Sequence, residues 1–187
     1  MEIIRLIGDF AHTLGSARDL SVLGDPIVAT LSQCTRLPEA ALWIRESEEG
    51  QYRLLASHGH SNPSPLPSTF PVGHTFVTAL SRKPYVIQAD QERSSPTYSA
   101  MTTVRATLCL ALRNKGRLLG LCILGPLGME KHLDEETMAI VETIAHIAAN
   151  SLDHYLAQDD LRRPTTLMRR TERHRSLEII AAGSAHQ

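Results

Sequence analysis

The stretch RATLCLALRNKGRLLGLCIL, residues 105–124, contains two apolar strands separated by a polar turn. Lys115-Gly116 fits a two-residue hairpin turn, and with such a turn the opposed positions sum to 231. In this register the leucines of both strands share one face, and Cys109 lies opposite Cys122 on the other face. Because both faces are apolar, we expect helices to cover one of them and loops or a ligand to cover the other.

Upstream of this hairpin, short strand-like segments bounded by turn residues such as Glu48-Glu49-Gly50 predict a larger sheet. We expect strands at residues 41–45, 52–57 and 84–88, a short helix at 73–81, and long loops at 59–71 and 88–101. Long loops inside a compact domain are usually functional, so this pair predicts a binding site.

A narrow apolar stripe follows the first residues of the chain. It contains Ile3, Ile7, Phe10 and Leu14. So thin a stripe favours a partner helix over a broad core, and we expect residues 1–16 to form a dimerisation and signalling helix. Ser16 and Asp19 resemble a capping box that opens a second helix. Asp25-Pro26 could restart or kink that helix before Pro38 ends it.

Residues 133–163 have the pattern of a long helix with two apolar stripes. One stripe contains Val141, Ala145, Ala148, Leu152 and Tyr155, and the adjoining one contains Ile140, Ile144 and Ile147. Two stripes must bury two surfaces, so we expect this helix to cover its own sheet and to contact a second subunit. We place Ile7, Val141 and Leu152 in the subunit interface. Pro164 interrupts the helix.

Charge and composition exclude several function classes. The 187 residues include 19 basic and 20 acidic side chains, which gives a net charge of −1. Such a balance disfavours a nucleic-acid partner or binding to a membrane surface. No apolar run is long enough for a membrane span, and the N-terminus is too polar for a signal peptide. Three irregularly spaced cysteines indicate neither a disulfide framework nor a metal motif, so we expect a soluble cytoplasmic protein.

The order of the predicted elements resembles a GAF domain. Val72-Gly73-His74 through Lys83-Pro84-Tyr85-Val86-Ile87 resembles the short helix and following strand of that family, and Arg117-Leu118-Leu119-Gly120-Leu121 resembles its glycine-containing strand. Leu133–Ile144 is similar to the start of the terminal helix. The resemblance covers residues 17–155. It implies an α+β fold with a central antiparallel sheet, helices on one face, pocket-forming loops on the other, and long terminal helices.

By this resemblance, a ligand pocket lies between the sheet and its two long loops. The implied lining residues are Trp43, Phe70, His74, Phe76, Val77, Tyr98, Met101, Cys109 and Cys122. The sequence does not identify the ligand of this pocket. Asn114-Lys115 matches the start of a motif found in GAF domains that bind cyclic nucleotides, but the later aromatic and acidic positions of that motif are not matched. Covalent attachment of a bilin would need a Cys-His pair, and the sequence contains none. Haem or a metal would need a ligand such as His58, His60 or His74, and loop histidines are usually solvated.

The last residues, SLEIIAAGSAHQ (176–187), resemble the H-box of a sensor histidine kinase. The resemblance implies that His186 is the phosphoacceptor, although Gln187 stands where an acidic neighbour is usual. We expect residues 156–187 to be a linker helix that leads into a truncated H-box. ATP would bind a catalytic domain outside this chain, a response regulator would be the partner of the full-length protein, and the chain alone would lack kinase activity.

One alternative comes from a different class of protein. Some free-standing GAF proteins reduce free methionine sulfoxide with three cysteines, and this chain has Cys34, Cys109 and Cys122. Buried cysteine acting as a small apolar residue is the stronger interpretation, because none of the three lies on a predicted loop. Opposed cysteines in a hairpin could form a disulfide only with strained geometry.

Overall fold

The computed structural model describes residues 2–46, 50–59, 66–90, 92–126 and 133–158. Within this part of the chain, six strands form one antiparallel sheet in the order β3-β2-β1-β6-β5-β4. The strands are β1 (Glu39–Arg45), β2 (Tyr52–His58), β3 (Thr69–Phe70), β4 (Tyr85–Ile87), β5 (Leu108–Asn114) and β6 (Arg117–Gly125). The expected α+β fold with a central antiparallel sheet is confirmed.

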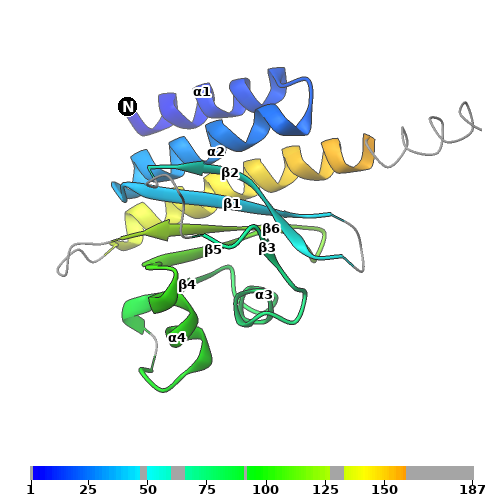
Figure 1. Cartoon of the computed structure of the whole chain (residues 1–187). Helices are drawn as coiled ribbons and strands as arrows, with labels where there is room; N and C mark the ends of the chain where they lie inside the picture. The colour runs from blue at the N-terminus through cyan, green and yellow to red at the C-terminus, as the bar shows by residue number, and fades with distance from the viewer. Residues whose placement is uncertain (1, 47–49, 60–65, 91, 127–132, 159–187) are drawn as a thin grey trace, which may run out of the picture. The chain divides into compact units, whose positions relative to one another are not determined.

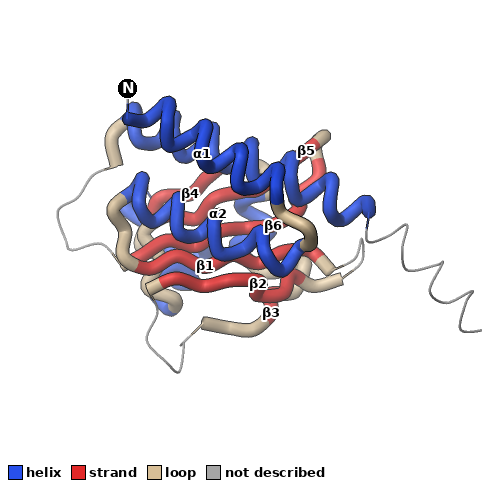
Figure 2. Tube along the Cα trace, turned by 90° about the horizontal axis from the view of Figure 1, so that it is seen from above, coloured by secondary structure: helices blue, strands red, loops and turns tan. Residues whose placement is uncertain are grey.

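Helices cover both faces of this sheet (Figure 1). They are α1 (Glu2–Ser16), α2 (Leu20–Thr35), α3 (Thr75–Leu80), α4 (Pro96–Thr103) and the 3-10 turn η1 (Gln88–Asp90). A further helix, here called the C-terminal helix, extends over residues 135–158. Figure 1 shows α1, α2 and the C-terminal helix on one side of the sheet, hereafter the helix face, and α3 and α4 on the other side, the pocket face. Figure 2 looks onto the helix face.

The helix face is closed by apolar side chains. Ile27 and Leu31 of α2 and Val141, Ile144 and Leu152 of the C-terminal helix are fully buried in this single chain. Placing Val141 and Leu152 in a subunit interface was therefore wrong. In the second stripe, Ile144 is likewise buried, but Ile140 and Ile147 are half-exposed. None of the helices in the described part of the chain is long and apolar enough to cross a membrane.

Helix α2 begins and continues differently from the sequence prediction. Asp19, and not Ser16, is its N-cap: the Asp19 carboxylate accepts hydrogen bonds from the backbone N–H groups of Ser21 and Val22 at 2.9 and 3.2 Å. Ser16 instead ends α1. The helix also passes through Pro26 without a break. Burial of the apolar side chains of this helix against the sheet offsets the single hydrogen bond that proline removes.

The β5–β6 hairpin has the expected turn and a different register. Lys115 and Gly116 both have positive φ, at 49° and 77°, as a two-residue type I′ turn requires. A bulge between Leu112 and Arg113 then shifts the pairing by one residue, so that Cys109 pairs with Ile123 and not with Cys122. Since neighbouring residues of a strand point to opposite faces, Cys109 and Cys122 lie on different sides of the sheet.

Both predicted long loops contain regular structure. The first, at residues 59–71, contains β3. The second, at residues 88–101, contains η1 and most of α4. Ser95 is the N-cap of α4, because its hydroxyl accepts a hydrogen bond from the backbone N–H of Tyr98 at 3.0 Å, and Pro96 occupies the first helical position. Ser95-Pro96, inside the segment that we predicted to be a loop, is therefore a helix start.

Candidate functional site

Four rings pack together on the pocket face. Trp43 of β1 is fully buried, and its indole N–H donates a hydrogen bond to the carbonyl oxygen of Pro67 at 2.9 Å. Its ring centroid lies 5.0 Å from that of Phe70, and the Phe70 centroid lies 4.6 Å from His74 and 5.6 Å from Phe76. Trp43 thus holds the segment before β3 against the sheet, and Phe70 joins that segment to the start of α3.

His74 is the polar member of this group. It is the N-cap of α3, and its Nδ1 accepts a hydrogen bond from the backbone N–H of Phe76 at 3.3 Å. Burial lowers the pKa of His74 below its ordinary value, because an apolar surrounding disfavours the charged imidazolium. The ring is therefore neutral at neutral pH, and with Nδ1 as an acceptor its proton resides on Nε2. A neutral imidazole of this tautomer can donate one hydrogen bond to a ligand.

A pocket of about 500 Å³ opens beside these rings, between α3, α4 and the segment that leads into β3. We call it the apolar pocket. It is lined by Leu66, Pro67, Thr69, Phe70, Pro71, His74, Phe76, Ala100, Thr103 and Val104. Three residues expected at the ligand site, Phe70, His74 and Phe76, are in this lining. Its volume lies within the usual range for small-molecule sites.

The other predicted site residues lie elsewhere. Trp43, Val77, Met101 and Cys109 do not line the apolar pocket, but they belong to the same buried cluster as Phe70 and Phe76 of its lining. Tyr98 is a half-buried residue of α4 outside the lining. Cys122 lies on the opposite face because of the bulge in the hairpin. His186 lies outside the described residues.

Several lining residues were missed from sequence. Ala100, Thr103 and Val104 come from α4 and its C-terminal end, which the sequence interpretation treated as a loop. The signal that could have found them is Ser95-Pro96, an N-cap followed by a first-turn proline. Leu66 and Pro67 belong to a proline-rich segment that carries no periodic pattern, and the Trp43 hydrogen bond that positions them is not visible in the sequence.

The three cysteines have the properties of structural residues. Burial raises the pKa of both Cys109 and Cys122 far above the ordinary thiol value, and it also raises the pKa of the half-buried Cys34. A thiol with a raised pKa forms little of the nucleophilic thiolate at neutral pH. The structure therefore does not support a cysteine-based reductase. Among the described residues, no group of three His, Cys, Asp or Glu side chains could hold a metal ion.

The fold has many relatives of known structure. The GAF domain of a phosphoenolpyruvate-protein phosphotransferase from Coxiella burnetii is 20% identical, with a TM-score of 0.68 over 84% of this chain and 96% of that chain. The chromophore-binding domain of a bacteriophytochrome from R. palustris is 14% identical, with a TM-score of 0.64 over 84% of this chain and 63% of that one. Residues 122 to 287 of a methyl-accepting chemotaxis protein are 11% identical, with a TM-score of 0.64 over 78% of this chain and 96% of that fragment.

These identities show a shared fold and nothing finer. No curated protein matches the chain. The profile of the GAF domain, in contrast, matches residues 19–152, more than half of the sequence and close to the span of 17–155 expected from the residues. The chain therefore belongs to the GAF domain family, whose members are sensory and regulatory ligand-binding domains of signalling proteins.

Proposed function

We propose that this chain is the sensory part of a sensor histidine kinase, in which a small ligand on the pocket face controls phosphorylation of His186. The GAF fold supports the sensory role, and the resemblance of residues 176–187 to an H-box supports the kinase context. In this proposal residues 1–16 and 156–187 are signalling helices on either side of the GAF domain.

The observation that carries the proposal is the apolar pocket. It is bounded by one imidazole and otherwise mainly by apolar side chains, and Phe70 and Phe76 of its lining belong to the buried cluster that contains Trp43. Such a lining suits a small, largely apolar molecule with a single hydrogen-bond acceptor that His74 can reach through Nε2–H. The ligand's identity is not specified further by these residues.

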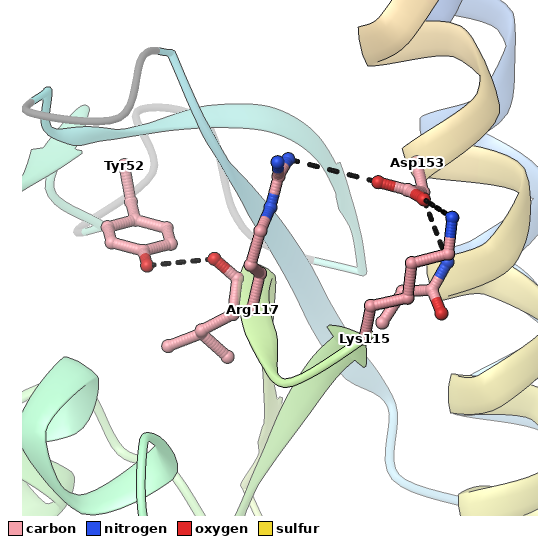
Figure 3. Close-up of polar contacts among 6 residues, drawn as sticks. Tyr52, Lys115, Arg117 and Asp153 are labelled. Carbon is pink, nitrogen blue, oxygen red and sulfur yellow. Dashed lines mark hydrogen bonds and ion pairs between the residues drawn. The ribbon is translucent and has the colours of Figure 1, made fainter.

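A route from the sheet to the C-terminal helix exists at the tip of the β5–β6 hairpin (Figure 3). Asp153 of that helix accepts a hydrogen bond from the Asn114 side-chain amide at 2.9 Å. Its carboxylate also lies 3.8 Å from the side-chain nitrogens of Lys115 and Arg117. Because residues of β5 and β6 belong to the same buried cluster as Phe70 and Phe76 of the pocket lining, a ligand that shifts these strands would change the contacts of Asp153.

Dimerisation through the terminal helices is the second half of the proposal. Ile4 of α1 is 77% exposed, and Ile140 and Ile147 of the C-terminal helix are half-exposed. Exposed isoleucines on two helices of the helix face favour a second copy of this chain as the partner. A ligand could then change the signal only if it binds two arrangements of the paired helices unequally.

The functional proposal is tested by phosphorylation. The chain is extended beyond Gln187 with the remaining kinase domains encoded downstream of it in the genome, and it is incubated with ATP labelled on the γ-phosphate. We expect an acid-labile phosphate on the wild-type protein and none on a His186→Ala variant. A stop codon directly after Gln187, or labelling that persists in His186→Ala, would contradict the proposal.

A further inference from the structure

A second pocket, here called the cationic pocket, lies at the other end of α3. It has a volume of about 480 Å³ and is bounded by the end of β1, the start of β2, the last turn of α3 and the tip of the β5–β6 hairpin. Its lining consists of Arg45, Tyr52, Val72, Val77, Thr78, Ser81, Arg82, Gly116, Arg117 and Leu118. Of this lining, the proposed sensory function uses only Arg117, through its contact with Asp153.

The charges of this lining have one sign. Three of the ten described lining residues are arginines, and none is Asp or Glu. The arginines come from three different elements, since Arg45 ends β1, Arg82 follows α3 and Arg117 begins β6. Three cations brought together by the fold around one hollow create a local positive potential, and that potential favours an anionic ligand.

The remaining lining divides into hydroxyl groups and an apolar wall. Tyr52, Thr78 and Ser81 supply the hydroxyls, and Val72, Val77 and Leu118 supply the wall. The Tyr52 and Ser81 hydroxyls already donate to the carbonyl oxygens of Leu118 and Val77, so they can only accept, and an anionic group depends on the arginines. A ligand that matches the arginines and the wall has an oxyanion and an apolar body. Arginine suits this role because its planar guanidinium binds the paired oxygens of a carboxylate or phosphate in a bidentate manner.

The position of Arg45 is defined by its strand. Arg45 pairs with Tyr52 across β1 and β2, so both side chains lie on the pocket face. The Tyr52 hydroxyl donates a hydrogen bond to the carbonyl oxygen of Leu118 at 3.1 Å, and this bond fixes the ring at the inner end of the pocket. Burial raises the pKa of Tyr52 and the charge of Arg45 opposes that rise, so the field of Arg45 reaches the hydroxyl.

Arg117 connects this pocket to the C-terminal helix. It lines the rim, while its guanidinium points to Asp153, with Nη2 3.8 Å from the nearer carboxylate oxygen (Figure 3). That distance is longer than a hydrogen bond, and the Arg117 side chain is 55% exposed. The contact is therefore a weak one that a competing anion can replace.

We propose that the cationic pocket binds a small organic anion, a carboxylate or a phosphate ester, through Arg45 and Arg82. The apolar body of the ligand packs against Val72 and Val77, and Arg117 at the rim makes the site sensitive to the hairpin's contact with Asp153. This site is separate from the apolar pocket. It goes beyond the proposed sensory function, and either of the two can fail without the other.

The test is a titration of the full 187-residue chain, followed by two-dimensional NMR of its backbone amides at constant ionic strength. Four probes separate the possible chemistries: inorganic phosphate, phenyl phosphate, benzoate and, as an uncharged control, benzyl alcohol. We expect saturable shifts of Gly116, Ser81 and Arg82 with phenyl phosphate or benzoate, weaker binding of inorganic phosphate, and no such shifts with benzyl alcohol. Whichever of phenyl phosphate and benzoate binds more tightly identifies the anionic group.

Variants of the arginines decide whether the shifts report this site. Arg45→Gln and Arg82→Gln should each weaken binding by about tenfold, the effect of one charge-assisted hydrogen bond. Arg53→Gln is the matched control, because it removes one positive charge from β2 at a residue that pairs with Glu46 and does not line the pocket. The proposal would be overturned if every salt shifted the same amide signals in proportion to ionic strength. It would also be overturned if the dissociation constant were unchanged in both Arg45→Gln and Arg82→Gln.

Discussion

The two faces of the sheet are covered by helices of very different length. On the helix face, α2 has 16 residues and spans about 24 Å, comparable to the strands that it covers. On the pocket face, α3 and α4 have only 6 and 8 residues and span about 9 and 12 Å. The 9-residue strand β6 extends for about 30 Å, much further than either short helix, and its residues 118–125 are nevertheless buried.

Both pockets lie beside α3. The apolar pocket is lined by residues around the start of α3 and the end of α4. The cationic pocket is lined by Val72 before α3, by residues of its last turn, and by Ser81 and Arg82 after it. The helix face, in contrast, is filled by fully buried Leu, Ile and Val side chains from three helices. The comparison indicates that the pocket face can bind small ligands. The helix face is a continuous packed layer, so a movement of the sheet would also move the helices packed on it.

The largest difference between the faces should appear in stability. Ile144 is fully buried on the helix face, and Ile144→Ala should lower the free energy of unfolding by about 2–5 kcal/mol, because it removes buried methyl groups and leaves a cavity. The measurement is urea denaturation followed by circular dichroism. His146→Ala on the exposed side of the same helix is the control and should change stability by less than about 0.5 kcal/mol. Equal effects of the two variants would contradict the assignment of the faces.

Substituting the isoleucines on the outer side of the helix face should change folding little and dimerisation strongly. Ile4→Lys combined with Ile147→Lys should leave the far-ultraviolet spectrum unchanged, because neither side chain is buried within the chain. If the helices pair with a second copy, light scattering should give the mass of a monomer for this variant and of a dimer for the wild type. A persistent dimer would exclude this surface as the interface.

On the pocket face, His74 should make stability depend on pH. Its pKa is lowered by burial, so the unfolded chain binds this proton more readily than the folded chain. The stabilising contribution is present above the ordinary histidine pKa of about 6.5 and is lost as the pH falls below that value. Urea denaturation at pH 7, 6 and 5 measures it. His74→Asn keeps an N-cap acceptor without a titrating ring, and it should flatten this decline; an unchanged decline would contradict the role of His74.

The smallest effect on stability is expected for substitutions at the contact between Asp153 and the tip of the β5–β6 hairpin. Asp153→Asn keeps an acceptor for the Asn114 amide and removes the charge that faces Lys115 and Arg117. Because both cations are mostly exposed, the free energy of unfolding should change by less than about 1 kcal/mol. Asp153→Ala also removes the hydrogen bond and should cost more. If Asp153→Asn destabilises the chain as much as Ile144→Ala does, the contact of Asp153 with the hairpin is a structural one. That result would contradict its proposed role as a weak contact that a ligand can change.

The sheet could be predicted because most of its strands are short apolar runs bounded by turn residues, which is a local signal. The turn at Lys115-Gly116 was predicted correctly for the same reason. The bulge next to Leu112 could not be predicted, since it follows from the pairing of β6 with its neighbours. A Cβ at Gly120 would lie 2.6 Å from the Trp43 carbonyl oxygen, a close approach between β6 and β1 that the sequence does not show. This one-residue shift is what moved Cys122 to the helix face.

The candidate site was predictable only in part. Phe70, His74 and Phe76 lie near the short helix that the sequence marked, and they line the apolar pocket. The rest of the lining comes from α4 and from the proline-rich segment, whose conformations depend on tertiary contacts such as the Trp43–Pro67 hydrogen bond. The arginines of the cationic pocket are far apart in sequence, and only the sheet order brings them together.

The most direct test of the central claim, that the pocket face receives a small apolar ligand, uses Trp43. It is the only tryptophan of the chain and packs against Phe70 in the pocket wall. Titration with cyclohexanol, an apolar ring with one hydroxyl, should change its fluorescence saturably, and the pocket-filling variant Ala100→Leu should abolish that change. A linear response, or the same saturable response in Ala100→Leu, would contradict the claim.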